Sequence, residues 1–112
     1  MEYNVHDNRF VEARIRRTPD SIYFDLDMLE YGTDKKITYS FVDIDWINSN
    51  FIGILAHEGS IYSISELSWN EVPELYAVNP ASMNFYKVIF SGGSEISIVA
   101  HSIIINLNRN II

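Results

Sequence analysis

Residues 85–107, FYKVIFSGGSEISIVAHSIIINL, contain two runs of β-branched and aromatic residues separated by Ser-Gly-Gly-Ser. Such residues favour strands, and glycine readily adopts the positive φ angles of tight hairpin turns. We therefore expect an antiparallel hairpin with arms at residues 85–90 and 95–105, joined by a two-residue primed turn at Gly92 and Gly93. This hairpin predicts a protein built from β-sheet.

Three more strands are expected near the N-terminus. Apolar and polar residues alternate in residues 9–17, 22–28 and 36–42, which is the pattern of strands with one buried face. Turn-forming residues separate them, with TPDS at 18–21 and YGTDK at 31–35. These segments predict an antiparallel meander.

The middle of the sequence has a weaker pattern. Residues 43–50 mix loop-favouring Asp and Asn with apolar residues, and the apolar run 51–57 fits either a strand or a buried helix. Residues 60–67 alternate weakly, which favours a strand. Residues 68–77 begin with a capping-box pattern and are expected to form one short helix.

Together these elements predict one domain over residues 1–112, because a chain of 112 residues is long enough for one core and too short for two. The fold class is all-β or β-dominated α+β. We expect a curved antiparallel sheet or a small sandwich of six to seven strands, with at most one short helix. The apolar faces of the first three strands and of the final hairpin should meet in one core.

Composition excludes several classes of site. The chain has no cysteine, so disulfides, thiolate catalysis and cysteine-based zinc sites are excluded. The first residues lack the basic and apolar runs of a signal peptide, and no stretch approaches the roughly 18 apolar residues of a membrane span. We expect a cytoplasmic protein that needs no cofactor.

Charge is unevenly distributed along the chain. Eight Lys and Arg against fifteen Asp and Glu give a net charge of -7, which argues against nucleic acid or an anionic membrane as the main partner. No Lys or Arg occurs between Lys36 and Lys87, whereas six acidic residues lie there. Such a surface either keeps a small protein soluble or steers a basic protein partner into contact.

Arginines are concentrated in the first strand, at positions 9, 14, 16 and 17. In a hairpin of residues 9–17 with 22–28, these side chains could lie across from Asp25 and Asp27. Cross-strand pairs of opposite charge stabilise a sheet by roughly 0.2 to 1 kcal/mol each. The basic cluster is then structural.

Motifs for catalysis are weak. His6-Asp7 precedes a strand, and the side chains of His57 and Glu58 would point to opposite faces of an extended segment. The carboxylate pairs Asp25-x-Asp27 and Asp43-x-Asp45 could act as acid and base or bind a cation, but solvated polar faces have the same pattern. We expect no enzymatic activity and no metal site.

A binding surface is the remaining candidate. Two tryptophans lie in the acidic middle of the sequence, and tryptophan beside carboxylates suits recognition of a cationic partner. The alternative is that both tryptophans belong to the core. The expected partner-binding residues are Asp43, Asp45, Trp46, Glu58, Glu66, Trp69, Glu71 and Glu74.

The chain also resembles a group of small, β-rich bacterial proteins, several of which are immunity proteins of polymorphic toxin or contact-dependent inhibition systems. The similar stretches are residues 5–7 (VHD), 40–44 (SFVDI) and 88–100 in the final hairpin. The resemblance implies a protein without enzymatic activity that neutralises a toxin, with its acidic surface covering a cationic active site. No individual binding residue follows from it.

Two alternatives to an inhibitor remain open. One is a structural or oligomer-forming accessory module whose exposed edge strand pairs with another copy. The other is a small metal-dependent hydrolase.

Overall fold

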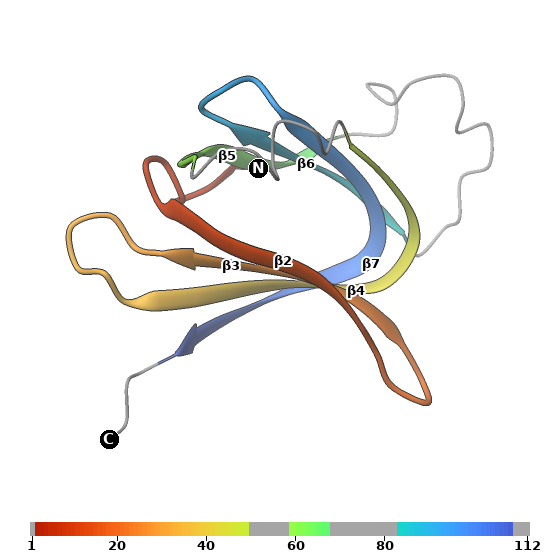
Figure 1. The fold of residues 1–112 in the computed structure, drawn as a ribbon. Coiled ribbons are helices and arrows are strands. Elements are labelled where there is room, and N and C mark those ends of the chain that lie inside the picture. The colour runs from red at the N-terminus through yellow and green to blue at the C-terminus, as the bar shows by residue number, and fades with distance from the viewer. Residues whose placement is uncertain (1, 50–58, 68–82, 109–112) are drawn as a thin grey trace.

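The computed structural model describes residues 2–49, 59–67 and 83–108. They form one antiparallel sheet of seven strands and no helix (Figure 1), which confirms the predicted fold class. The expected helix at 68–77 and the run 51–57 lie outside the described residues. The strands are β1 (Glu2–Tyr3), β2 (Arg9–Arg17), β3 (Ile22–Leu29), β4 (Lys36–Ser49), β5 (Ile61–Leu67), β6 (Asn84–Phe90) and β7 (Glu95–Asn108).

The sheet folds back on itself through its two longest strands. Its order is β1-β5-β6-β7-β4-β3-β2, and β4 and β7, each of 14 residues, pair with each other along nearly their whole length. Both strands curve strongly, so that β5 and β6 lie over β2 and β3 (Figure 1). We call β2, β3, the first half of β4 and the second half of β7 the β3 layer. The other halves of β4 and β7, with β6, β5 and β1, form the β6 layer.

The two long strands change face at the bend. Phe41 and Ile44 both pack in the core, and so do Ala100 and Ile103 on the neighbouring strand, although residues three apart in a regular strand point to opposite faces. On β4 the change coincides with a φ of 56° at Asp43. The register with β7 then shifts between Ile44 and Trp46, which leaves Asp45 as an extra residue in a β-bulge.

The prediction of an irregular segment at 43–50 was therefore wrong for residues 43–49. Asp and Asn favour turns because they tolerate left-handed backbone conformations. Here that tolerance produces a bend and a bulge inside a strand, because pairing with β7 continues on both sides of Asp43.

The core lies between the two layers. It contains Phe24, Leu26 and Met28 of β3 together with the hairpin residues Val88 and Ile96, which confirms that the meander and the final hairpin share one core. The first strand joins this core only through Phe10 and Ala13, because Val11 and Ile15 are exposed. Aromatic rings join the layers, and the centroids of Phe41 and Tyr86 are 5.3 Å apart, those of Phe10 and Phe90 5.4 Å, and those of Tyr3 and Tyr39 5.9 Å.

One side of the fold is closed by main-chain hydrogen bonds. The Asp7 N–H donates to the Ile61 carbonyl (2.9 Å), and the Ile61 N–H donates to the Asn8 carbonyl (2.7 Å). Strand β1 pairs with β5, and β2 follows β1 directly in the sequence. The short turn between β1 and β2 therefore joins the two ends of the sheet. Strand β1 was not predicted, because its two residues are too few to show an alternating pattern.

The turn of the final hairpin differs from the predicted primed type. Phe90 pairs with Ser94, and the Gly93 N–H donates to the Phe90 carbonyl (2.9 Å), so the loop has three residues. Only Gly93 has a positive φ, at 93°. A type I turn followed by one left-handed residue produces this loop, and the twist of the strands tolerates it as well as a primed turn.

Replacing Ile98 by Ala should cost about 2–5 kcal/mol in unfolding free energy, because Ile98 is fully buried between the layers. Ile104→Ala, on the same strand but exposed, should change it by less than about 0.5 kcal/mol. Urea titration of both variants measures the difference. Equal losses would contradict the placement of the core.

Candidate functional site

The strongest concentration of charge is a network on the outer face of β3. Asp25 and Asp27 are buried there, on the side opposite to the core residues Phe24 and Leu26. Arg16 Nε donates to Asp25 Oδ2 at 2.8 Å, and Arg14 forms an ion pair with Asp27. The predicted pairing of the basic cluster with these two carboxylates is confirmed for Arg14 and Arg16.

Hydroxyl groups of β4 complete this network from the other side. Ser40 Oγ donates to Asp25 Oδ1 at 2.7 Å, and Thr38 Oγ1 donates to Asp27 Oδ1 at 2.6 Å. Both oxygens of each carboxylate are thus hydrogen-bonded, as buried charges require. The pair Asp25-x-Asp27, a possible acid and base in the sequence, therefore holds three strands together.

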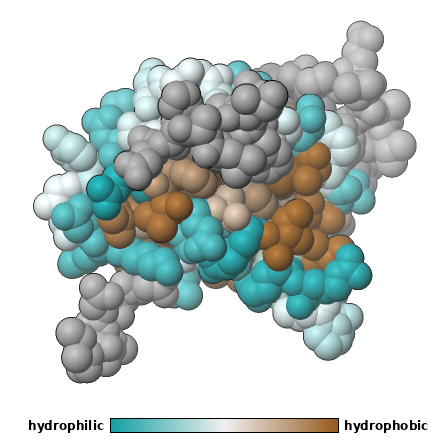
Figure 2. Space-filling model, in the orientation of Figure 1, coloured by the Kyte–Doolittle hydropathy of each residue, from teal (hydrophilic) through white to brown (hydrophobic). Residues whose placement is uncertain are grey.

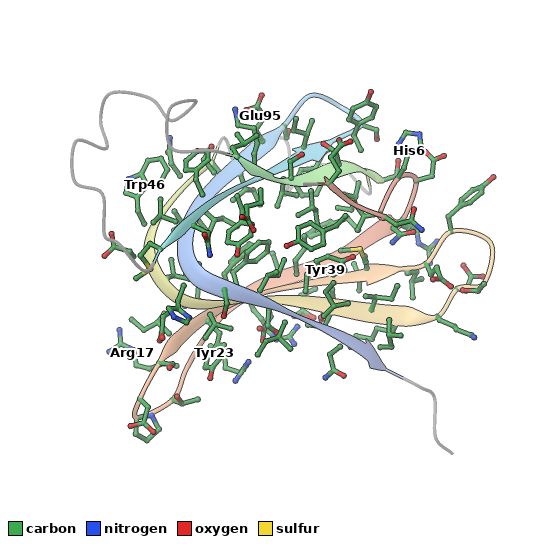
Figure 3. The ribbon with its side chains drawn as sticks, turned by 180° about the vertical axis from the view of Figure 1, so that it is seen from behind. His6, Arg17, Tyr23, Tyr39, Trp46 and Glu95 are labelled. Carbon is green, nitrogen blue, oxygen red and sulfur yellow. The ribbon has the colours of Figure 1, made fainter. Side chains whose placement is uncertain are left out.

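Burial favours the neutral form of Asp25, but hydrogen bonds from Arg16 and Ser40 together outweigh it. The pKa of Asp25 therefore lies below its usual value. Arg16 is further held over the Tyr23 ring, with its guanidinium carbon 4.1 Å from the ring centroid. Figure 3 shows Tyr23 and Arg17 at this end of the β2–β3 hairpin.

The His6-Asp7 pair lies in the turn between β1 and β2. His6 Nε2 is 3.6 Å from Asp7 Oδ2, and its ring meets the Tyr62 ring edge to face at 5.3 Å. Asp7 has a φ of 69°, which fits a turn residue. No cluster of three or more metal-ligating side chains occurs in the part of the chain that the structure describes. His57 and Glu58 lie outside that part.

The expected partner-binding residues separate into three groups. Asp43, Asp45 and Trp46 lie together at and after the bend of β4. Glu66 lies elsewhere, on β5. The other four, Glu58, Trp69, Glu71 and Glu74, fall outside the described residues.

Glu66 faces the interior side of the β6 layer. Its cross-strand partner is Tyr86, which is buried in the core. Burial and the nearby charge of Glu66 raise the pKa of Tyr86 to about 12. Glu66 is therefore separated from the surface that carries Asp45, although one acidic stretch of sequence contains both.

Trp46 belongs to an apolar row on the outer face of the β6 layer. It pairs with Val99, which pairs with Phe85, which in turn pairs with Leu67. Val99 and Phe85 are fully buried but do not belong to the core between the layers. Trp46, partly exposed, lies at the β4 end of this row (Figure 3).

The second half of β4 is an edge of the β6 layer. Its pairing with β3 ends at Val42, so that in the residues described only β7 pairs with it beyond the bend. Asp45 is exposed on this edge. A polar hollow of about 290 Å³ lies at the end of β4, lined by Asn48, Ser49, Gly93, Glu95 and Ser97.

The Ser49 hydroxyl is buried at this hollow without a hydrogen-bond partner in the described structure. Glu95, which also lines this hollow, forms an ion pair with Lys87 at 3.2 Å. An edge that combines an acidic bulge with a partly exposed tryptophan can receive a polar or cationic group of another molecule.

Comparison of the chain with protein-family models, curated proteins and solved structures gave no match. None of the residues that the structure describes forms a helix long and apolar enough to cross a membrane.

Asp25→Asn should lower the unfolding free energy at pH 7 by about 1–3 kcal/mol, because a buried charged hydrogen bond is lost. A carboxyl whose pKa is depressed by folding stabilises the protein above its unfolded pKa of about 3.9 and loses that effect as pH falls through its folded pKa. The wild-type protein should therefore lose stability below about pH 4, and the variant should lose less.

Asp20→Asn is the matched control, since Asp20 is exposed in the β2–β3 turn. The thermal unfolding midpoint, measured from pH 7 to pH 2, should depend on pH in this control as it does in the wild type. An Asp25→Asn profile parallel to the wild type would show that Asp25 does not contribute to the acid sensitivity.

Proposed function

We propose that this protein is a protein-binding inhibitor that recognises a basic partner through the bent edge of β4. The observation that carries the proposal is the position of Asp43, Asp45 and Trp46 at the bend of a strand with one free edge. The resemblance to immunity proteins makes a bacterial toxin domain the expected partner.

Electrostatics support a basic partner. Within the described structure, neither Asp43 nor Asp45 forms an ion pair, whereas the arginines Arg14 and Arg16 are paired with Asp25 and Asp27. Two of the four arginines of the basic cluster are thus neutralised locally in a chain of net charge -7. The negative potential at the β4 edge is therefore available to steer a positively charged protein.

The bulge determines how the edge would be used. A β-bulge interrupts the row of main-chain groups, re-aims a side chain and discourages pairing with a foreign strand. Docking at Asp45 is therefore by side chains, with Trp46 as a large apolar contact beside the charge. The metal-dependent hydrolase stays a prediction for which the described residues provide no metal site.

The test uses the gene neighbourhood to choose its probe, the C-terminal domain of a large secreted protein encoded beside this chain. Wild-type protein should restore growth of bacteria that express this domain and should bind it in a salt-dependent manner. Asp45→Lys should slow association by about tenfold and flatten the salt dependence, because it reverses the steering charge.

Glu2→Lys gives the same change in net charge at an exposed position on β1, at the opposite edge of the β6 layer from β4, and should bind as the wild type does. Association rates measured by surface plasmon resonance at several salt concentrations separate the two variants. Equal rates for Asp45→Lys and the wild type would refute docking at the β4 edge, and so would an equal effect of Glu2→Lys.

A further inference from the structure

Among the residues that the structure describes, no strand pairs with the outer side of the second half of β7, which is therefore a second free edge, on the β3 layer. Pairing of β7 with β6 begins at Glu95 and ends at Ala100, whereas pairing with β4 continues to Asn108. The Asn84 side chain donates to the His101 carbonyl at 2.9 Å and ends the β6 ladder. Beyond this point the strand projects from the molecule towards the C-terminus (Figure 1).

Large apolar side chains are exposed along this edge. Ile104, Ile105 and Leu107 are 54%, 44% and 63% exposed. Ile104 lies on the outer face, since it pairs with Ser40, and Ile105 lies on the inner face, since it pairs with Tyr39. Apolar side chains also reach the surface elsewhere, in patches bordered by hydrophilic residues (Figure 2).

This edge lacks the features by which proteins protect exposed strands. Residues 101–108, HSIIINLN, contain no Asp, Glu, Lys, Arg or Pro, and no register shift interrupts their pairing with β4. Charges, prolines and bulges are the usual protection against strand pairing.

The opposite edge of the same layer is protected. Strand β2 carries charged residues at five of its nine positions, and its register with β3 shifts between Phe10 and Glu12. Since both edges belong to one layer of one small protein, the difference indicates that the β7 edge is covered by a partner strand in the working protein.

We propose that residues 101–107 pair with the same residues of a second copy of this chain, antiparallel and around a two-fold axis. Cross-strand partners share a face, so the register must place a residue opposite itself or opposite one an even number of positions away. A register centred on Ile104 places Ile104 opposite Ile104 of the second copy, and Ile103 opposite Ile105 of the second copy. The two β3 layers then form one continuous sheet.

A second copy fits this edge for electrostatic reasons. Two chains of net charge -7 repel each other at most surfaces, but residues 101–107 of both partners contain no Asp, Glu, Lys or Arg, so no such charges meet along the paired strands. The pairing covers Ile104 and Ile105 of both copies and satisfies the main-chain groups at the edge. This interface goes beyond the proposed inhibitor function, because the β4 edge belongs to the other layer and stays accessible.

Sedimentation velocity from low micromolar to near-millimolar concentration should show a monomer–dimer equilibrium for the wild type. Ile104→Lys should raise the dimer dissociation constant by about tenfold or more, because it places two cations opposite each other. Ile15→Lys is the matched control, an exposed isoleucine (65%) on the protected β2 edge, and should dimerise as the wild type does. An equimolar mixture of Ile104→Lys and Ile104→Glu should regain dimer formation.

A wild type that is monomeric at every concentration would overturn the proposal, and a dimer that Ile104→Lys leaves intact would do the same. Hydrogen exchange of the wild type gives a test that needs no substitution. The amides within residues 101–107 that point to the free edge, which alternate with those paired to β4, should exchange more slowly as protein concentration rises. Protection that is independent of concentration, or that appears only with a different protein present, would assign the edge to another occupant.

Discussion

The change of face within β4 and β7 is the constraint on which this structure depends. A flat sheet of seven strands would leave one apolar face in water, but two shared strands that reverse their side-chain direction at Asp43 and near His101 let one sheet cover itself. The core then forms between two layers of the same sheet. The same bend separates the two halves of each long strand and leaves a free edge on each layer.

The buried network on β3 has a consequence for the rest of the surface. Arg14 and Arg16 pair with Asp25 and Asp27, so these two arginines contribute little field at a distance. Asp45 in the acidic bulge forms no ion pair within the described residues. The two free edges differ accordingly, since the β4 edge offers charge and a tryptophan whereas the β7 edge offers an uncharged strand.

Much of the fold could be predicted from local patterns. Alternation identified β2, β3 and β5, the turns at 18–21 and 31–35 were expected, and the pairing of the arginines with Asp25 and Asp27 followed from the hairpin. These features depend on neighbours in sequence. The continuation of β4 beyond Asp43 could not be predicted in this way, because pairing with β7, some 50 positions away, stabilises it against the turn preference of Asp and Asn.

The candidate site was predicted in part. Asp45 and Trp46 lie together on one edge, but Glu66 points towards Tyr86 because its position on β5 has the same parity as the buried Ile64. That parity was present in the sequence. A bulge between Ile61 and Ser63 obscured it, since the register shift breaks the alternation that would have identified the inner face. The free edges depend on strand order, which no local pattern determines.

The folded-back sheet is tested most directly by nuclear Overhauser effects between its layers. Phe41 and Tyr86 belong to different layers, and so do Phe10 and Phe90, with ring centroids 5.3 and 5.4 Å apart. The protein in dilute solution should show cross-peaks between the ring protons of both pairs. Absence of these cross-peaks in a protein whose strand pairing is otherwise intact would contradict the bend and the two layers that it creates.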